Sequence, residues 1–179
     1  MIDDEFTNRR QPPTTPYRPS GRILEAPESL LAQTLAALQS VPMREAACLW
    51  LGVSEGNSAR VKALVVPRQW NRRLNYEIPA EAMQTVAELA RPRGWTLLAN
   101  IHSHPGADTE HSLYDDEMMP SRKALSLVFP WHGHWRSPWP YDAGVHEFVD
   151  DYWHLLTEDA AGDRIVWRMD LPLTLKDLR

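Results

Sequence analysis

Two histidines and an aspartate are spaced in this sequence like ligands of one metal ion. His102 and His104 end an apolar run that reads as a strand, so their side chains point to the same face. Pro105 forces an extended exit from that strand. A helix that begins at Ser112 would carry Asp115 three residues further on, and a short loop can fold it back toward the histidines. The segment therefore predicts a site built from His102, His104 and Asp115.

Two neutral imidazoles and a carboxylate suit Zn²⁺ and leave the fourth tetrahedral position for water, as in a catalytic site. A structural zinc site would be closed, usually by cysteines. The chain has one cysteine, Cys48, which excludes a cysteine-closed site and an intramolecular disulfide. We interpret Cys48 as a small core residue, and its isolation favours a reducing compartment, the cytoplasm.

Zinc-activated water also needs a base. Glu45 stands just before the apolar run from Ala46 to Val53, where it could reach the metal site. Spacing alone does not choose it over Glu81 or Glu110.

The run His-Ser-His-Pro, six residues, Ser, two residues, Asp resembles the JAMM signature of the JAB/MPN metalloproteases. The block Glu45 to Gly52 is similar to the upstream block of that family, with Cys48 where glycine is common. The likeness extends over residues 22–169. It implies that His102, His104 and Asp115 bind zinc. It also implies that Glu45 is the general acid and base and that Ser112 assists the oxyanion.

The resemblance further implies an α+β, JAB1/MPN-like (cytidine-deaminase-like) fold, with a mixed, largely antiparallel sheet flanked by helices. The stretches 125–130 and 144–148 resemble bacterial JAB proteins that accompany ubiquitin-like conjugation systems. The implied substrate is therefore the tail of a ubiquitin-like protein or its conjugates, with activating (E1-like) and conjugating (E2-like) enzymes as partners. A non-catalytic MPN scaffold and a JAB-type amidohydrolase for an unrelated substrate are the alternatives.

Other histidines and several tryptophans need a separate interpretation. His111 and Asp116 flank the signature, but Asp116 would point about 100° around a helix from Asp115. A second His-x-His, His132 and His134, has no carboxylate at useful spacing. It lies in a proline-punctuated, tryptophan-rich loop, 131–141. We interpret this loop as a surface that faces a partner or the substrate, with Trp135 as a recognition residue. The alternative is that its tryptophans fill the bottom of the core or an oligomer contact.

The elements that must position these residues follow from periodicity and turn chemistry. We expect strands at 22–26, 46–53, 59–66, 95–101, 125–129, 144–156 and 164–169, with an acidic turn between the last two. Helices are expected to begin near Pro27 and Ile78, and a short one to cover 112–118. Residues 1–20 are rich in proline and read as a flexible arm, followed by one domain from 21 to 179.

Composition limits the class of protein. Of 179 residues, 43% are hydrophobic and 24% charged, which is typical of a soluble domain. The formal net charge of −5 argues against a general nucleic-acid binder. No apolar run is long enough for a membrane span, and the acidic N-terminus is not typical of a secretory signal.

Overall fold

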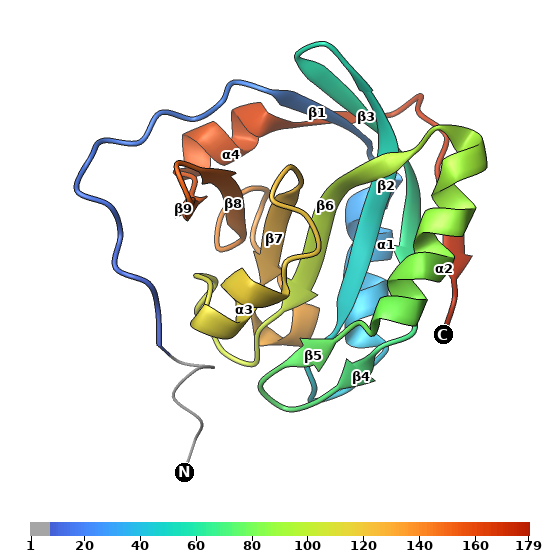
Figure 1. The fold of residues 1–179 in the computed structure, drawn as a ribbon, viewed down its shortest axis with the longest axis horizontal. Coiled ribbons are helices and arrows are strands. Elements are labelled where there is room, and N and C mark those ends of the chain that lie inside the picture. The colour runs from blue at the N-terminus through green and yellow to red at the C-terminus, as the bar shows by residue number, and fades with distance from the viewer. Residues whose placement is uncertain (1–7) are drawn as a thin grey trace.

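Strands β2 (Ala47–Glu55) and β6 (Thr96–Ser103) lie side by side at the centre of the sheet in the computed structural model, which describes residues 8–179. Within that range the large sheet has nine strands in the order β10-β1-β3-β2-β6-β7-β8-β9, with β11 also paired to β3. Figure 1 shows the sheet curling along this order. The other strands are β1 (Ile23–Pro27), β3 (Ser58–Val66), β7 (Leu125–Phe129), β8 (Gly144–Val149), β9 (Tyr152–Leu155), β10 (Ile165–Arg168) and β11 (Thr174–Asp177).

Helices cover both faces of this sheet. Helix α1 (Ser29–Gln39) and helix α2 (Ala80–Ala90) lie on opposite faces, and α3 (Leu113–Met118) lies near the lower ends of β6 and β7 in Figure 1. Helix α4 (Glu158–Arg164) leads into β10. The smaller elements are the 3₁₀ turns η2 (Arg91–Arg93) and η3 (Trp131–Gly133) and the two-stranded pair of β4 (Trp70–Asn71) and β5 (Tyr76–Glu77).

Alternate residues of β2 supply the two halves of the core. Cys48 and Trp50 pack with α1, whereas Leu49 and Leu51 pack with α2, because successive strand side chains point to opposite faces. The indole nitrogen of Trp50 donates a hydrogen bond to the Thr34 hydroxyl of α1 at 3.0 Å. Burial on both faces fixes the register of β2 and so of the residues at its ends.

The predicted α+β class is confirmed, and the predicted strands at 22–26, 46–53, 59–66, 95–101 and 125–129 are present within a few residues of their predicted ends. The sheet is more evenly mixed than expected. Four of its eight strand pairs are parallel, β1 with β3 and β10, β3 with β11, and β6 with β7.

Two predictions for the C-terminal part were wrong. The expected strand 144–156 is a hairpin of β8 and β9, which turns at Asp150 and Asp151 with positive φ at both residues. The expected acidic turn is helix α4, whose first turn is capped by the Thr157 hydroxyl. The sequence pattern does not indicate the short strands β4, β5 and β11.

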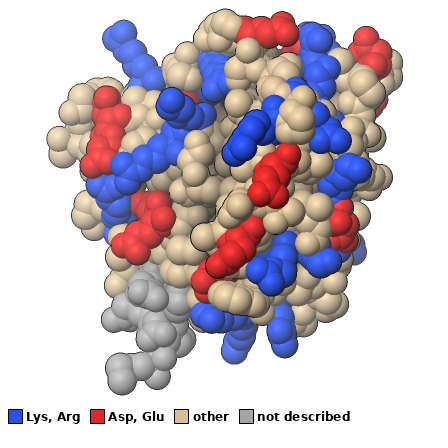
Figure 2. All heavy atoms as spheres, turned by 45° about the vertical axis from the view of Figure 1, so that its right-hand side comes forward, with Lys and Arg blue, Asp and Glu red and all other residues tan. Residues whose placement is uncertain are grey.

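The proline-rich segment has no helix or strand from Asn8 to Arg22, and the first seven residues of the predicted arm lie outside the described residues. Among residues 8–179 no helix is long and apolar enough to cross a membrane. On the face shown in Figure 2, basic and acidic side chains are interspersed and form no extended patch of one sign.

Candidate metal centre

The carboxyl end of β6 brings the predicted ligand residues together. The Nε2 atoms of His102 and His104 are 3.2 Å apart. The Asp115 carboxylate lies 3.4 Å from the first of these nitrogens and 3.3 Å from the second. One donor atom from each side chain falls within 4.8 Å of the others, and no other group of this kind occurs in the described part of the chain.

The local sequence explains how Asp115 reaches the histidines. Ser112 is the N-cap of α3 and forms a capping box with Asp115. The Ser112 hydroxyl donates to Asp115 Oδ2 at 2.7 Å, and the Ser112 backbone N–H donates to the same oxygen at 2.8 Å. The cap therefore fixes the carboxylate as well as starting the helix. Because the Ser112 hydroxyl donates its proton to Asp115, this serine is placed to orient the Asp115 carboxylate.

Sheet register places Glu45 beside the same point. Ala47 pairs with His102 in the antiparallel β2–β6 ladder, so Glu45, two residues earlier, lies opposite His104. The backbone of Glu45 is also fixed by the β4–β5 region, because its N–H donates to Arg72 O at 2.8 Å and its carbonyl accepts from the Asn71 amide at 2.8 Å.

These residues share one hollow of about 240 Å³. Its lining includes Glu45, His104, Ser112 and Asp115, together with Asp108 and Glu110 of the loop before α3. Of the two alternatives to Glu45, Glu110 lies at the rim, whereas Glu81 lines a different depression on α2.

Burial and neighbouring charges shift the pKa values of the site's histidine and carboxyl groups in different directions. Burial lowers the pKa of His102 to about 3, which keeps the ring neutral, as a metal ligand must be. Burial alone would raise the pKa of Asp115, but the adjacent His102 and His104 outweigh it and the pKa falls below its usual range. Burial raises the pKa of Glu45 from 4.5 to about 8; His104 opposes this rise and Asp115 adds to it.

The ring nitrogens of the two histidines are arranged as a divalent metal ion requires. Two imidazole nitrogens that face each other at 3.2 Å cannot both carry a proton, whereas both can donate a lone pair to one ion. The second ring nitrogen of His104 lies 2.9 Å from the Asp108 carbonyl, which is the outer contact that orients a metal-binding imidazole. The corresponding nitrogen of His102 is buried and has no hydrogen-bond partner among residues 8–179.

His111 and Asp116, which flank the signature, do not belong to this donor set. His111 is buried, with Nδ1 at 3.0 Å from Asp116 Oδ1 and Nε2 at 2.8 Å from the Ser126 hydroxyl. Its ring also stacks on that of His146 at 4.1 Å. Neither His146 nor Tyr76, whose ring is 5.3 Å from that of His102, could be found from the sequence, because both are far from the motif along the chain.

The predicted recognition role of Trp135 is not supported by its position. Trp135 and Trp139 are half-buried against the main core, and Trp135 makes edge contacts with Phe129 and Trp139 at 5.6 and 6.4 Å. His132 is also buried, with Nδ1 at 3.0 Å from the Arg44 carbonyl. Trp131, 53% exposed, is the tryptophan of this loop that faces solvent.

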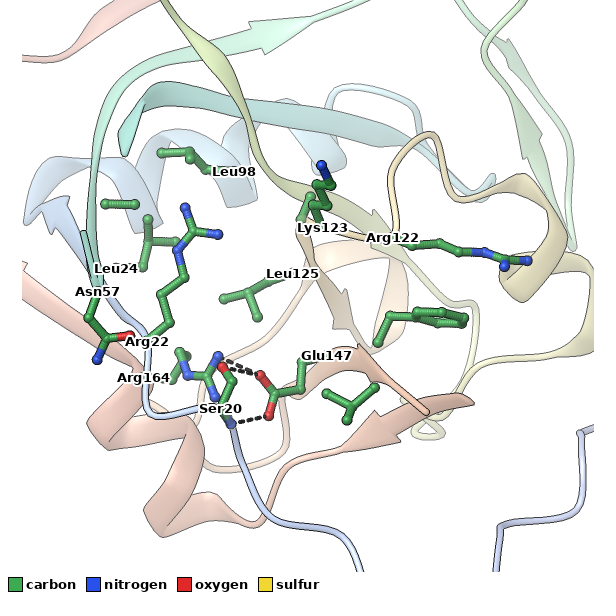
Figure 3. A pocket seen from close by; sticks show the side chains of 14 residues that line it. Ser20, Arg22, Leu24, Asn57, Leu98, Arg122, Lys123, Leu125, Glu147 and Arg164 are labelled. Atoms are coloured by element: carbon green, nitrogen blue, oxygen red, sulfur yellow. Dashed lines mark hydrogen bonds and ion pairs between the residues drawn. The ribbon is translucent and has the colours of Figure 1, made fainter. Parts of the chain in front are cut away.

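A larger hollow of about 420 Å³ lies at the opposite ends of β6 and β7, around Leu98 and Leu125 (Figure 3). Its charged lining is mostly cationic and includes Arg22 and Lys123. The histidines are at the other end of β6, so the chemistry is located by the donor set and not by the size of the hollow.

Comparisons with known proteins concern the fold and the family of this chain. The solution structure of protein DSY2949 from Desulfitobacterium hafniense is similar with a TM-score of 0.66 and 16% identity, over 83% of this chain and 95% of that one, which shows the fold. A Sinorhizobium fredii (strain NBRC 101917 / NGR234) protein named "Probable metalloprotease y4jG" is 33% identical over 117 residues, which are 61% of this chain and 72% of that relative.

The model of prokaryotic homologs of the JAB domain matches residues 27–141, a range that contains Glu45 and the whole His102–Asp115 segment. The family match and the relative together support a metal-dependent peptidase of the JAB type. The chain belongs to the prokaryotic JAB family.

Proposed function

We propose that this protein is a zinc-dependent peptidase that cleaves the amide bond after the C-terminal tail of a ubiquitin-like protein. The observation that carries the proposal is the cluster of His102, His104 and Asp115, of which His104 and Asp115 share one hollow with the buried acid Glu45. Two histidines and one carboxylate leave a coordination position open, which distinguishes a catalytic zinc site from a structural one.

When bound, zinc supplies a Lewis acid that lowers the pKa of a water molecule and polarises the scissile carbonyl. Glu45 would be the residue that accepts a proton from the attacking water and passes it to the leaving amine. Burial raises the pKa of Glu45 in the metal-free site, and a bound dication would favour its charged form, which is the form that accepts a proton. Ser112 keeps the Asp115 carboxylate in place through two hydrogen bonds, from its hydroxyl and its backbone N–H.

The size of the hollow supports a slim substrate. About 240 Å³ is less than the ~300–1,000 Å³ that small-molecule pockets usually have, so a narrow extended tail fits better than a compact molecule. The likeness of 125–130 and 144–148 to bacterial JAB proteins of conjugation systems supports a ubiquitin-like tail in particular. The complete donor set argues against a non-catalytic scaffold.

The test uses a ubiquitin-like protein whose tail is extended by a short peptide. We expect the zinc-loaded protein to release that peptide, with one cut detected by mass spectrometry. Glu45→Gln should reduce the rate by at least ~10²-fold while zinc content and melting temperature are retained. Release by Glu45→Gln at the normal rate would contradict the assigned base.

A second substrate tests the specificity. The same peptide sequence without the ubiquitin-like body should be cleaved with a lower kcat/KM. Equal kcat/KM on both substrates would point to a general peptidase, the alternative that acts on unrelated substrates.

A further inference from the structure

The described part of the predicted arm, Asn8 to Ser20, is called the arm from here on. It runs around the side of α4 and β9, and its outer end lies near α3 (Figure 1). Its inner end is anchored to a buried ion pair. The backbone N–H and the hydroxyl of Ser20 each donate to the Glu147 carboxylate at 2.8 Å. Glu147 is itself buried and accepts from Arg164 at 2.6 Å (Figure 3). The arm therefore leaves the domain from a fixed point.

The middle of the arm contacts the β8–β9 hairpin. The Tyr17 ring stacks on the His154 ring, with centroids 4.0 Å apart and planes within 4°. The Tyr152 hydroxyl donates to the Arg10 carbonyl at 3.3 Å, and the Arg10 guanidinium donates to the Asp151 carbonyl at 2.9 Å. These contacts direct the outer end of the arm toward the metal centre.

The outer end reaches the rim of the candidate site. The backbone N–H of Leu113, the first residue of α3, donates to the Asn8 carbonyl at 2.8 Å. The Arg9 guanidinium donates to the carboxylates of both Asp108 and Glu110, at 2.6 Å for the second. Both acids line the hollow of Glu45 and His104.

We propose that the arm is an intramolecular competitor of the substrate, with Arg9 in a rim position that receives an arginine side chain of the substrate chain. This proposal rests on the proposed peptidase function and adds a specificity for arginine near the scissile bond. Asp108 and Glu110 are then the residues that determine this specificity. A planar guanidinium suits two neighbouring carboxylates better than an ammonium does, because its donors form a fork.

The ion pairs of Arg9 with Asp108 and Glu110 are weak enough for the arm to dock reversibly. The side chains of Arg9, Asp108 and Glu110 are 40%, 55% and 50% exposed, so solvent screens both ion pairs. Exposed pairs of this kind change an equilibrium by about 1.4- to 5-fold each, so the two together favour the docked arm by roughly 2- to 25-fold. A substrate arginine can displace such a contact.

The first experiment compares peptides that differ only in arginine or citrulline at one position near the scissile bond, since citrulline keeps the shape and removes the charge. For arginine peptides we expect Arg9→Gln to lower KM by roughly 2- to 25-fold without changing kcat. Asp108→Asn combined with Glu110→Gln should remove both the preference for arginine over citrulline and the effect of Arg9→Gln. The loop should keep its shape in this double variant, because the side-chain amide introduced by Asp108→Asn retains an oxygen that can accept the Glu110 N–H, as Asp108 Oδ1 does at 3.0 Å.

Arg10→Gln is the matched control, because Arg10 is the neighbouring arm arginine and interacts with Asp151 instead. Its KM should change less than that of Arg9→Gln, because Arg10 does not contact the rim acids and its carbonyl still accepts from Tyr152. The proposal is overturned if Arg9→Gln and Arg10→Gln give the same KM, or if citrulline peptides bind as well as arginine peptides at every position tested.

A binding measurement separates this proposal from the proposed function. Fluorescence anisotropy of a labelled arginine peptide is measured on Glu45→Gln protein, with and without Arg9→Gln. Tighter binding after Arg9→Gln, without hydrolysis by the unchanged protein, would support the rim position and refute the peptidase. Hydrolysis by the unchanged protein, with no change in binding, would refute the rim position alone.

Discussion

Burial of Glu45 should contribute a loss of stability to the metal-stripped protein as the pH rises, and Glu45→Gln should remove that contribution. Glu45 is 4% exposed, and burial raises its pKa from 4.5 to about 8. A carboxyl group with a raised pKa in the folded state stabilises that state fully below pH 4.5. The contribution is lost as the pH rises toward 8, because the unfolded chain ionises first.

The magnitude follows from the two pKa values. The interval from 4.5 to about 8, at ~1.4 kcal/mol per pH unit, sets a ceiling of about 5 kcal/mol on the free energy of unfolding. Most of this falls between pH 5 and pH 8, where we expect a loss of roughly 3–4 kcal/mol. His102 acts in the opposite direction, because burial lowers its pKa to about 3 and its contribution is lost as the pH falls below 6.5. Only the difference between the two proteins therefore isolates Glu45.

The assay is urea unfolding of metal-stripped protein at pH 5, 6.5 and 8, with and without Glu45→Gln. The advantage of the variant should grow across this range, and added zinc should shrink it, because a nearby dication favours the charged carboxylate. Glu110→Gln, at the exposed rim of the same hollow, is the matched control and should run parallel to the unchanged protein. A stability difference between Glu45→Gln and the unchanged protein that is the same at pH 5 and pH 8 would refute the reasoning.

Three further predictions concern the metal and the frame around it. Replacing His102 and His104 together by alanine should reduce bound zinc from about one per chain to a trace by elemental analysis, and undiminished zinc would contradict the ligand assignment. Trp135→Ala should lower the free energy of unfolding by about 2–4 kcal/mol, since it removes core contacts and the hydrogen bond from its indole to the Tyr141 carbonyl, and should affect cleavage of long and short substrates equally. A larger loss of cleavage on the long substrate than on the short one would instead support a recognition role for Trp135. Gly144→Ala should cost about 1–3 kcal/mol in the same unfolding assay and weaken zinc binding, because the added Cβ would lie 2.3 Å from the Thr109 carbonyl of the metal-site loop. Gly106→Ala, with open space around it in that loop, is its control and should unfold like the unchanged protein.

The proximity of the three candidate ligand residues could be predicted from the sequence because their geometry is local. Alternation along a strand fixes His102 and His104, and the cap at Ser112 fixes Asp115. Glu45 needed the family resemblance, since its place opposite His104 depends on the register of two strands that are far apart in the chain.

The parts that were predicted wrongly, or that the structure does not support, depend on tertiary packing or on uncommon turn chemistry. The β8–β9 turn uses two consecutive aspartates with positive φ, where Asn-Gly would have been the recognisable signal. Trp135 lies in a loop whose composition does not show which side faces the core. Its neighbour Trp139 packs against Trp167 of β10, at 5.4 Å between ring centroids, and no local pattern links these segments.

The compactness of the ligand segment along the chain has a consequence for metal uptake. His102, His104 and Asp115 lie within fourteen consecutive residues, so an unfolded chain keeps them within reach of one another at a small cost in loop closure. Affinity of the unfolded chain for zinc subtracts from the stabilisation that zinc gives the folded protein. Glu45, the proposed base, by contrast comes close to these residues only when β2 pairs with β6. A misfolded molecule can therefore carry a full complement of metal and remain inert, so the fraction of active molecules has to be titrated independently of metal content.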